Sequence, residues 1–226
     1  MIKAIFFDLD NTLIDFLTMK HKCCEAAIDA MIKAGLNMKR KKALKVLVEI
    51  HSKYGIEHKQ IFQKFLKKTK RKVDYKIVAH GVVAYRKLKE SYLAPYPHVI
   101  PTLIQLKKKY KLGIISDAPR MRAWLRLVTM NIDRFFDVVI TAADVRKKKM
   151  YAAPFKAALK QLKVKPEEAI MVGDRIERDI KPAKALGIKT CYARYGAKYE
   201  KIKPVPKGKS GADFEIDNSK DLLKLV

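Results

Sequence analysis

Short apolar runs alternate along most of the chain with longer segments whose apolar residues recur at helical spacing. Continuous apolar runs of this length predict buried strands, and the helical spacing predicts amphipathic helices. The predicted strands are residues 3–8, 112–115, 138–141, 169–172, 189–192 and 213–216. The predicted helices between and after them are 99–110, 120–130, 154–163, 177–186 and a last one at the C-terminus. This alternation predicts an α/β fold, a Rossmann-like parallel sheet core with helices on both faces.

Residues 15–92 interrupt the alternation directly after the first predicted strand. Four amphipathic segments follow one another there without a strand, at 18–34, 40–53, 57–69 and 74–90. A segment with two prolines, 93–97, leads back into the alternating pattern. We therefore expect a catalytic core of residues 1–14 and 93–226 and an inserted four-helix cap domain of residues 15–92. An insertion at this point emerges where open parallel sheets bind ligands, so we expect it to form a lid.

Composition indicates a globular protein in a reducing compartment. With 226 residues, 49% of them hydrophobic, the chain can bury a sizeable core. No apolar run is long enough to cross a bilayer, and no signal-peptide pattern precedes the first strand. Three cysteines do not make a disulfide framework. We expect a cytoplasmic protein with no membrane contact, and the sequence leaves monomer and homodimer open.

The chain is strongly basic. Its 50 Lys and Arg against 23 Asp and Glu give a net charge of +27, which favours anionic partners and speeds their encounter. The lysines are scattered over every predicted helix and do not gather in one arm or tail. For nucleic acid we therefore expect no more than non-specific, salt-sensitive binding.

Acidic and hydroxyl side chains follow the ends of the predicted strands. Asp8 and Asp10 end the first strand and point the same way, because successive strand residues alternate between faces. Two like charges crowded at the end of a buried strand are costly unless a cation lies beside them. Ser116 and Asp174 follow two later strands, and Asp179 follows shortly after. The carboxyl ends of parallel strands share one edge, so these side chains should meet in one crevice.

This set of residues suits phosphoryl transfer. Asp8 can attack phosphorus and form an aspartyl-phosphate, and Asp10 can protonate the leaving oxygen and later take a proton from water. Asp8, Asp174 and a carbonyl of the first loop offer Mg²⁺ the oxygen ligands that it prefers. Ser116 can hold phosphate oxygens, and a lysine near residue 149 can balance the developing charge.

Four ordered segments resemble the motifs of the haloacid dehalogenase superfamily. They are Asp8-Leu9-Asp10-Asn11-Thr12, Ile114-Ile115-Ser116, the lysine around 149, and the stretch from Gly173 to Asp179. The resemblance implies a Rossmann-like core, a helical cap, an Asp nucleophile, Mg²⁺ and, in most members, phosphatase activity.

The resemblance also assigns a role to each matching position. Asp8 matches the nucleophile and a metal ligand, Asp10 the acid/base whose carbonyl binds the metal, and Asp174 a further metal ligand. Asp179 matches an acidic residue that supports the metal and its ligands. Ser116 matches the phosphate-binding residue and Thr12 a support of the loop. Together with Asp117, these two complete the expected substrate-binding residues.

The third motif departs from the usual pattern of Lys-Pro with a Phe six residues after the Lys. Lys149 stands six residues before Phe155, but Met150 occupies the usual Pro position. Spacing favours Lys149, and Lys147 and Lys148 stay open as alternatives.

We therefore expect a Mg²⁺-dependent phosphatase that hydrolyses a small phosphorylated metabolite through an aspartyl-phosphate. The alternatives are a phosphomutase, a C–halogen hydrolase, and a non-catalytic basic nucleic-acid-binding protein on the same fold. Dehalogenases of the superfamily lack an acid at the position of Asp10, and a complete buried acidic set without catalysis would be a stability burden.

Overall fold

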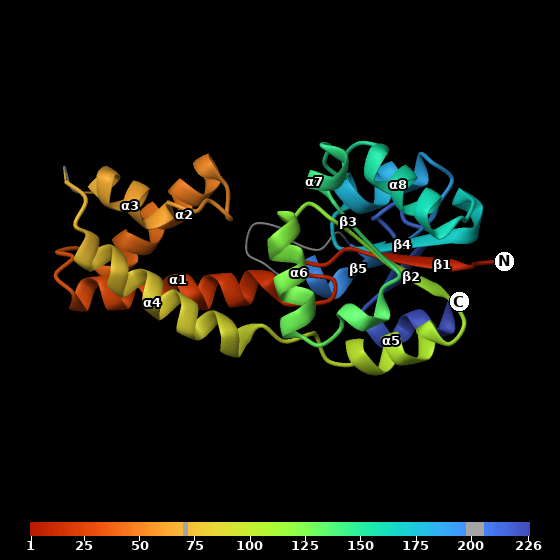
Figure 1. Ribbon diagram of the computed structural model, residues 1–226, viewed down its shortest axis with the longest axis horizontal. Coiled ribbons are helices and arrows are strands. Elements are labelled where there is room, and N and C mark those ends of the chain that lie inside the picture. Colours follow the sequence, from red (N-terminus) through yellow and green to blue (C-terminus); the bar gives the residue numbers. More distant parts are fainter. Residues whose placement is uncertain (70–71, 198–205) are drawn as a thin grey trace. The chain divides into compact units, whose positions relative to one another are not determined.

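The computed structural model describes residues 1–69, 72–197 and 206–226 and divides into two units (Figure 1). The sheet unit comprises Met1–Leu17 and Leu93–Val226, and the helical unit comprises Thr18–Tyr92. That the helical unit acts as a cap stays a prediction. Within the described ranges, no helix has the length and apolar character needed to cross a bilayer.

The sheet unit contains a six-stranded parallel sheet of order β3-β2-β1-β4-β5-β6. Its strands are β1 (Ala4–Phe7), β2 (Lys111–Ser116), β3 (Val138–Thr141), β4 (Ala169–Gly173), β5 (Lys189–Ala193) and β6 (Phe214–Ile216). The apolar runs of the sequence form these strands because both faces of the sheet are covered. The predicted Rossmann-like α/β core is confirmed.

Helices lie on both faces of this sheet (Figure 1). They are α5 (Val99–Lys107), α6 (Arg120–Thr129), α7 (Ala142–Val145), α8 (Ala153–Leu162) and α9 (Lys181–Lys184). Helix α8 covers one face, where its fully buried Phe155 packs in a cluster with Phe6 of β1 and Met171 of β4. Helix α5 lies on the opposite face (Figure 1). Successive residues of the central strands therefore point alternately into two core layers, one on each face of the sheet.

The described residues of the helical unit form four consecutive helices. They are α1 (Phe16–Lys33), α2 (Arg40–Tyr54), α3 (Ile61–Thr69) and α4 (Tyr75–Tyr92). The first two residues of α1 belong to the sheet unit. Their apolar faces form one core that includes the buried Met31, Leu47, Phe65 and Ile77. The helical periodicity of the sequence thus corresponds to a bundle that has its own hydrophobic centre.

Two predicted helices take other forms. The predicted helix 177–186 is a π-helical turn, Ile176–Ile180, followed by the short α9, which has a proline near its start. The predicted C-terminal helix is a 3₁₀ helix, Ser219–Lys224, whose first turn is capped by the side chain of Asn218. Hydrogen bonds from a side chain to the nearby backbone, such as the Asn218 cap, compete with regular α-helical geometry. π-helical turns are frequent at functional sites.

Candidate active site

Three neighbouring strands deliver the predicted residues to one edge of the sheet. In the register of β1, Phe7 lies beside Ile114 of β2 and Val172 of β4. The next residue, Asp8, donates its backbone N–H to the Val172 carbonyl at 2.9 Å. Asn11 then turns the chain with a φ of 64°, a left-handed conformation that Asn tolerates better than most residues. The sharp turn places the first motif directly at the end of β1.

Asp8, Asp174 and Asp179 form a cluster of buried carboxylates. Each offers an oxygen within 4.8 Å of the others, and their exposed fractions are 5%, 3% and 0%. Burial and the neighbouring carboxylates raise the pKa of Asp174 well above its usual value. Burial likewise raises the pKa of Asp179 to about 6 and raises that of Asp8. A cation is needed to stabilise these groups in their charged forms.

Lys149 supplies one positive charge to this cluster. Its Nζ forms ion pairs with Asp8 and, at 2.6 Å, with Oδ1 of Asp179. Burial alone would lower the pKa of Lys149, but the two carboxylates outweigh burial and raise it. The buried side chain is therefore an ammonium group held against the proposed nucleophile.

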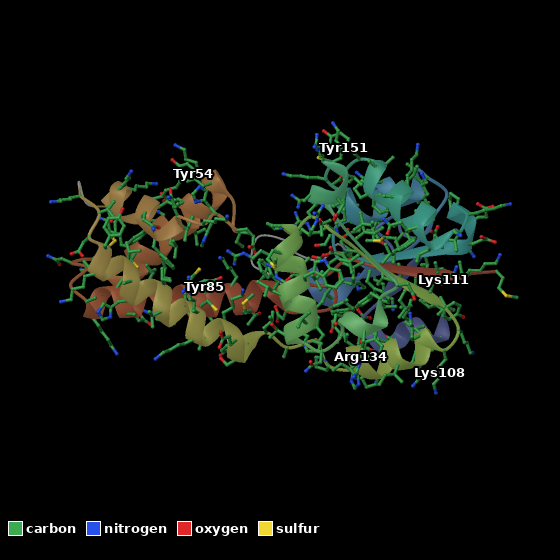
Figure 2. All side chains as sticks on the ribbon, viewed as in Figure 1. Tyr54, Tyr85, Lys108, Lys111, Arg134 and Tyr151 are labelled. Carbon is green, nitrogen blue, oxygen red and sulfur yellow. The ribbon has the colours of Figure 1, made fainter. Side chains whose placement is uncertain are left out.

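The two alternative lysines lie outside the cluster. Lys147 and Lys148 are exposed, and the Nζ of Lys147 lies 5.2 Å from the ring centre of Tyr151, a half-exposed residue at the surface of the sheet unit (Figure 2). The structure thus brings Lys149, and neither neighbour, to the carboxylates. Its catalytic role stays a proposal.

Ser116 and Asp117 lie at the end of β2, beside the cluster. Asp117 accepts a hydrogen bond from the Lys149 backbone N–H at 2.8 Å. It also forms an ion pair with Nη1 of Arg178 at 3.3 Å. Ser116 is buried, and its Oγ accepts the Ala118 N–H at 3.2 Å. Asp117 therefore fixes the loop that carries Lys149, and the predicted substrate contacts of both residues stay predictions.

The segment after β5 holds the first motif from the other side. The Tyr195 hydroxyl donates to the Thr12 carbonyl at 2.8 Å. The Gly196 backbone lies so close to this loop that a Cβ at residue 196 would be 1.9 Å from the Asn11 carbonyl oxygen. Thr12 is fully buried, and its hydroxyl has no hydrogen-bond partner among the described residues. Sequence reasoning missed this brace, although a Tyr-Gly pair that begins three residues after the predicted strand 189–192 was the available signal.

A second residue that sequence reasoning missed is Arg126 of α6. Its Nη1 lies 2.9 Å from Oδ2 of Asp10, and its side chain is only 3% exposed. The guanidinium carbon lies 4.3 Å from the centre of the Phe16 ring. The available signal was an arginine on the apolar face of the predicted helix, next to Leu127 and three residues after Ala123.

The donor set fits a divalent cation. Oδ1 of Asp174 is buried without a hydrogen-bond partner in the described part of the chain, and unsatisfied buried carboxylate oxygens are costly. Carboxylate and carbonyl oxygens are the ligands that Mg²⁺ binds through. The geometry therefore supports metal-assisted chemistry on an anionic substrate.

Residues 5–193 match a family model described as haloacid dehalogenase-like hydrolase. The chain is 37% identical over 234 residues to a glyceraldehyde 3-phosphate phosphatase of Methanopyrus kandleri, a match that covers 100% of this chain and 97% of that protein. It is 38% identical over 226 residues to the enzyme of the same name from Pyrococcus furiosus, with 100% and 93% covered.

Solved structures of the same fold are similar over the whole chain. A HAD phosphatase from Thermococcus onnurineus matches with a TM-score of 0.71 and 28% identity, covering 99% of this chain and 97% of that one. The HAD hydrolase YfnB from Bacillus subtilis, crystallised with magnesium, matches with a TM-score of 0.72 and 16% identity, covering 99% and 98%. At 16% identity, the match to YfnB supports the fold alone.

Proposed function

The chain belongs to the haloacid dehalogenase-like hydrolases and is a phosphoric monoester hydrolase, and we propose that it is a Mg²⁺-dependent phosphatase working through an aspartyl-phosphate. Its substrate in this proposal is a small phosphorylated metabolite. The observation that carries the proposal is the buried cluster of Asp8, Asp174 and Asp179 with the Lys149 ammonium at the carboxyl end of adjacent strands.

In the first step an oxygen of Asp8 attacks phosphorus and forms a P–O bond. The ester P–O bond breaks, and Asp10 gives its proton to the departing alkoxide. Lys149, already paired with Asp8, stabilises the negative charge that spreads over the phosphoryl oxygens. Positioning and electrostatics supply most of the acceleration in such transfers.

In the second step water attacks the phosphorus of the aspartyl-phosphate. Asp10, now a carboxylate, takes a proton from this water, and the bond between phosphorus and the Asp8 oxygen breaks. Inorganic phosphate leaves, and both carboxyl groups return to their starting states. One residue thus serves both proton transfers, and this requires that its position be well defined.

The residues that would hold Mg²⁺ are the carboxylates of Asp8 and Asp174 and the carbonyl of Asp10. When bound, the ion offsets repulsion between the phosphate and the surrounding carboxylates. Asp179 pairs with Lys149 and accepts the Arg175 backbone N–H at 2.9 Å, so we assign it to supporting the ligands.

The relatives suggest which metabolite to test first. Several proteins at 36–38% identity over the whole chain are named glyceraldehyde 3-phosphate phosphatase. We therefore propose a three-carbon aldehyde phosphate as the substrate, with the helical unit Thr18–Tyr92 acting as a cap that selects it and excludes water.

The test measures phosphate release from glyceraldehyde 3-phosphate and from p-nitrophenyl phosphate, with Mg²⁺ and with a chelator. Asp8→Asn should abolish turnover of both substrates. Asp217→Asn is the matched control, because the Asp217 side chain is 67% exposed and pairs with Arg194, outside the cluster. Turnover that survives in Asp8→Asn, or that needs no divalent ion, would refute the proposed mechanism. A substrate panel without preference for the triose phosphate would refute the substrate proposal only.

A further inference from the structure

Arg126 is a buried charge with a defined partner. A guanidinium removed from water is costly unless a carboxylate and further contacts compensate for it. Arg126 is only 3% exposed in its side chain, and its Nη1 lies 2.9 Å from Oδ2 of Asp10. The two residues are 116 positions apart. The fold therefore brings a permanent positive charge from α6 to the residue proposed to move protons.

The aromatic ring of Phe16 fixes the guanidinium from another side. The guanidinium carbon lies 4.3 Å from the ring centre, a favourable arrangement for a cation over a π face. Phe16 is buried, and the next residue, Leu17, donates its N–H to the Asn11 side chain at 3.1 Å. The start of α1 is thus tied to the same loop that carries Asp10.

Asp10 needs such a partner because it lies beyond the end of β1. The strand ends at Phe7, and the loop turns through the left-handed Asn11. A carboxylate on a loop can rotate about its side-chain bonds, whereas proton transfer requires hydrogen-bond reach to the reacting oxygen. An arginine presents a planar, pre-organised group of donors, so it defines direction as well as charge.

We propose that Arg126 is a positioning residue that orients the Asp10 carboxyl group toward the leaving oxygen and the attacking water. The proposal rests on the proposed function, in which Asp10 protonates the leaving group. Arg126 itself does not touch substrate in this proposal. Its contribution should therefore depend on how much the leaving group needs a proton.

Leaving groups separate this role from a merely structural one. An alkyl phosphate expels a strongly basic alkoxide, which requires the proton from Asp10. The p-nitrophenolate ion is a stable anion and departs with much less help. The ratio of kcat/KM for an alkyl phosphate to kcat/KM for p-nitrophenyl phosphate therefore reports on proton delivery, whereas general loss of folded enzyme lowers both values equally.

The experiment measures this ratio in the full chain with Mg²⁺ for wild type, Asp10→Asn, Arg126→Met, Arg126→Lys and Arg134→Met. Asp10→Asn sets the full effect of losing proton transfer. Arg126→Met should lower the ratio by about tenfold or more, a part of the factor of about 10²–10⁴ typical of general acid–base catalysis. Arg126→Lys should recover part of the loss, because it restores a cation but not the planar group.

Arg134→Met is the matched control. Arg134 is exposed (Figure 2), and its guanidinium carbon also lies near an aromatic ring, 5.3 Å from the centre of Phe135. This variant should leave the ratio unchanged. If Arg126→Met does not fold, Phe16→Leu tests the same arrangement by removing only the stacking, and it should lower the ratio by a smaller factor.

Equal losses for the two substrates in Arg126→Met, or a ratio that stays at the wild-type value while Asp10→Asn lowers it, would overturn the positioning role. These outcomes differ from failure of the proposed function. That failure would appear as Asp8→Asn retaining turnover, or as Asp10→Asn leaving the ratio unchanged.

Discussion

Replacing Gly196 by alanine tests whether the loop of the first motif, Asp8 to Thr12, is held in place by Tyr195 and Gly196, which follow β5. The added Cβ would lie 1.9 Å from the Asn11 carbonyl oxygen and 2.8 Å from Cβ of Asp174. Real Cβ atoms essentially never come closer than 3.0 Å, so the loop or the segment must move by about 1 Å. Overpacking of this kind costs about 1–3 kcal/mol, which for a chain of this length lowers the melting temperature by about 2–12 °C.

The effect on catalysis should be larger than the effect on stability. Asn11 is bonded directly to Asp10, so a displacement of its carbonyl moves the proposed acid/base, and misplacing a reacting group by about 1 Å can cost about 100-fold in rate. The assay compares kcat and thermal unfolding of Gly196→Ala with those of Gly81→Ala. A Cβ at Gly81 would lie 2.8 Å from Cγ and Sδ of the buried Met31 side chain, so this variant also forces a shift, but in the core of the helical unit and away from Asp10. Alanine itself favours the α4 helix by about 1 kcal/mol.

The control variant should therefore keep the wild-type kcat per folded molecule, while any change in its melting temperature reports overpacking alone. If Gly196→Ala kept wild-type kcat, or lost activity only in proportion to unfolded protein, the bracing argument would be refuted.

Three further outcomes follow from burial and charge. Phe65→Ala, at a fully buried position in the helical unit, should destabilise that unit by about 3–5 kcal/mol, measured by chemical unfolding against the half-exposed Tyr54→Ala. Burial and the nearby Lys20 lower the pKa of His51 from 6.5 to about 4. Below pH 6.5 the unfolded chain therefore binds a proton that the folded chain resists, and stability falls. His51→Leu should remove about 2 kcal/mol of this loss at pH 5, and identical pH profiles for variant and wild type would contradict the shift. Asp174→Asn should raise the melting temperature in a chelator, because it relieves like-charge repulsion, and it should abolish any stabilisation by Mg²⁺ in the same thermal scan.

The parts of the site that sequence predicted are those fixed by local pattern. An apolar run that ends in an acid places that acid at a strand end, and β1 and β4 are neighbours in the sheet, so Asp8 and Asp174 had to meet. The spacing from Lys149 to Phe155 also has a physical origin. Phe155 is a fully buried residue of α8 in the core of the sheet unit, and the six-residue spacing then sets how far the lysine reaches.

The missed residues depend on contacts that are distant in sequence. Arg126 meets Asp10 across 116 positions, and Tyr195 meets Thr12 across 183. No periodicity reports which loop a helix or strand end will face. The π-helical turn at Ile176–Ile180 was missed for a related reason, because there the Asp179 carboxylate accepts the Arg175 N–H. A side chain that bonds its own backbone sets a geometry that propensities alone do not predict.

The residues just before and just after the inserted helical segment are hydrogen-bonded to each other. Ile14 and Pro95 form an antiparallel bridge, and the Tyr96 N–H donates to the Leu13 carbonyl at 2.8 Å. The two ends of the inserted segment are therefore clamped together within the sheet unit, a few residues from the proposed nucleophile. A change in the length or packing of what lies between these ends therefore need not move the loop of the proposed nucleophile. The clamp therefore separates the geometry of the loop that carries Asp8 and Asp10 from the length and packing of the insert.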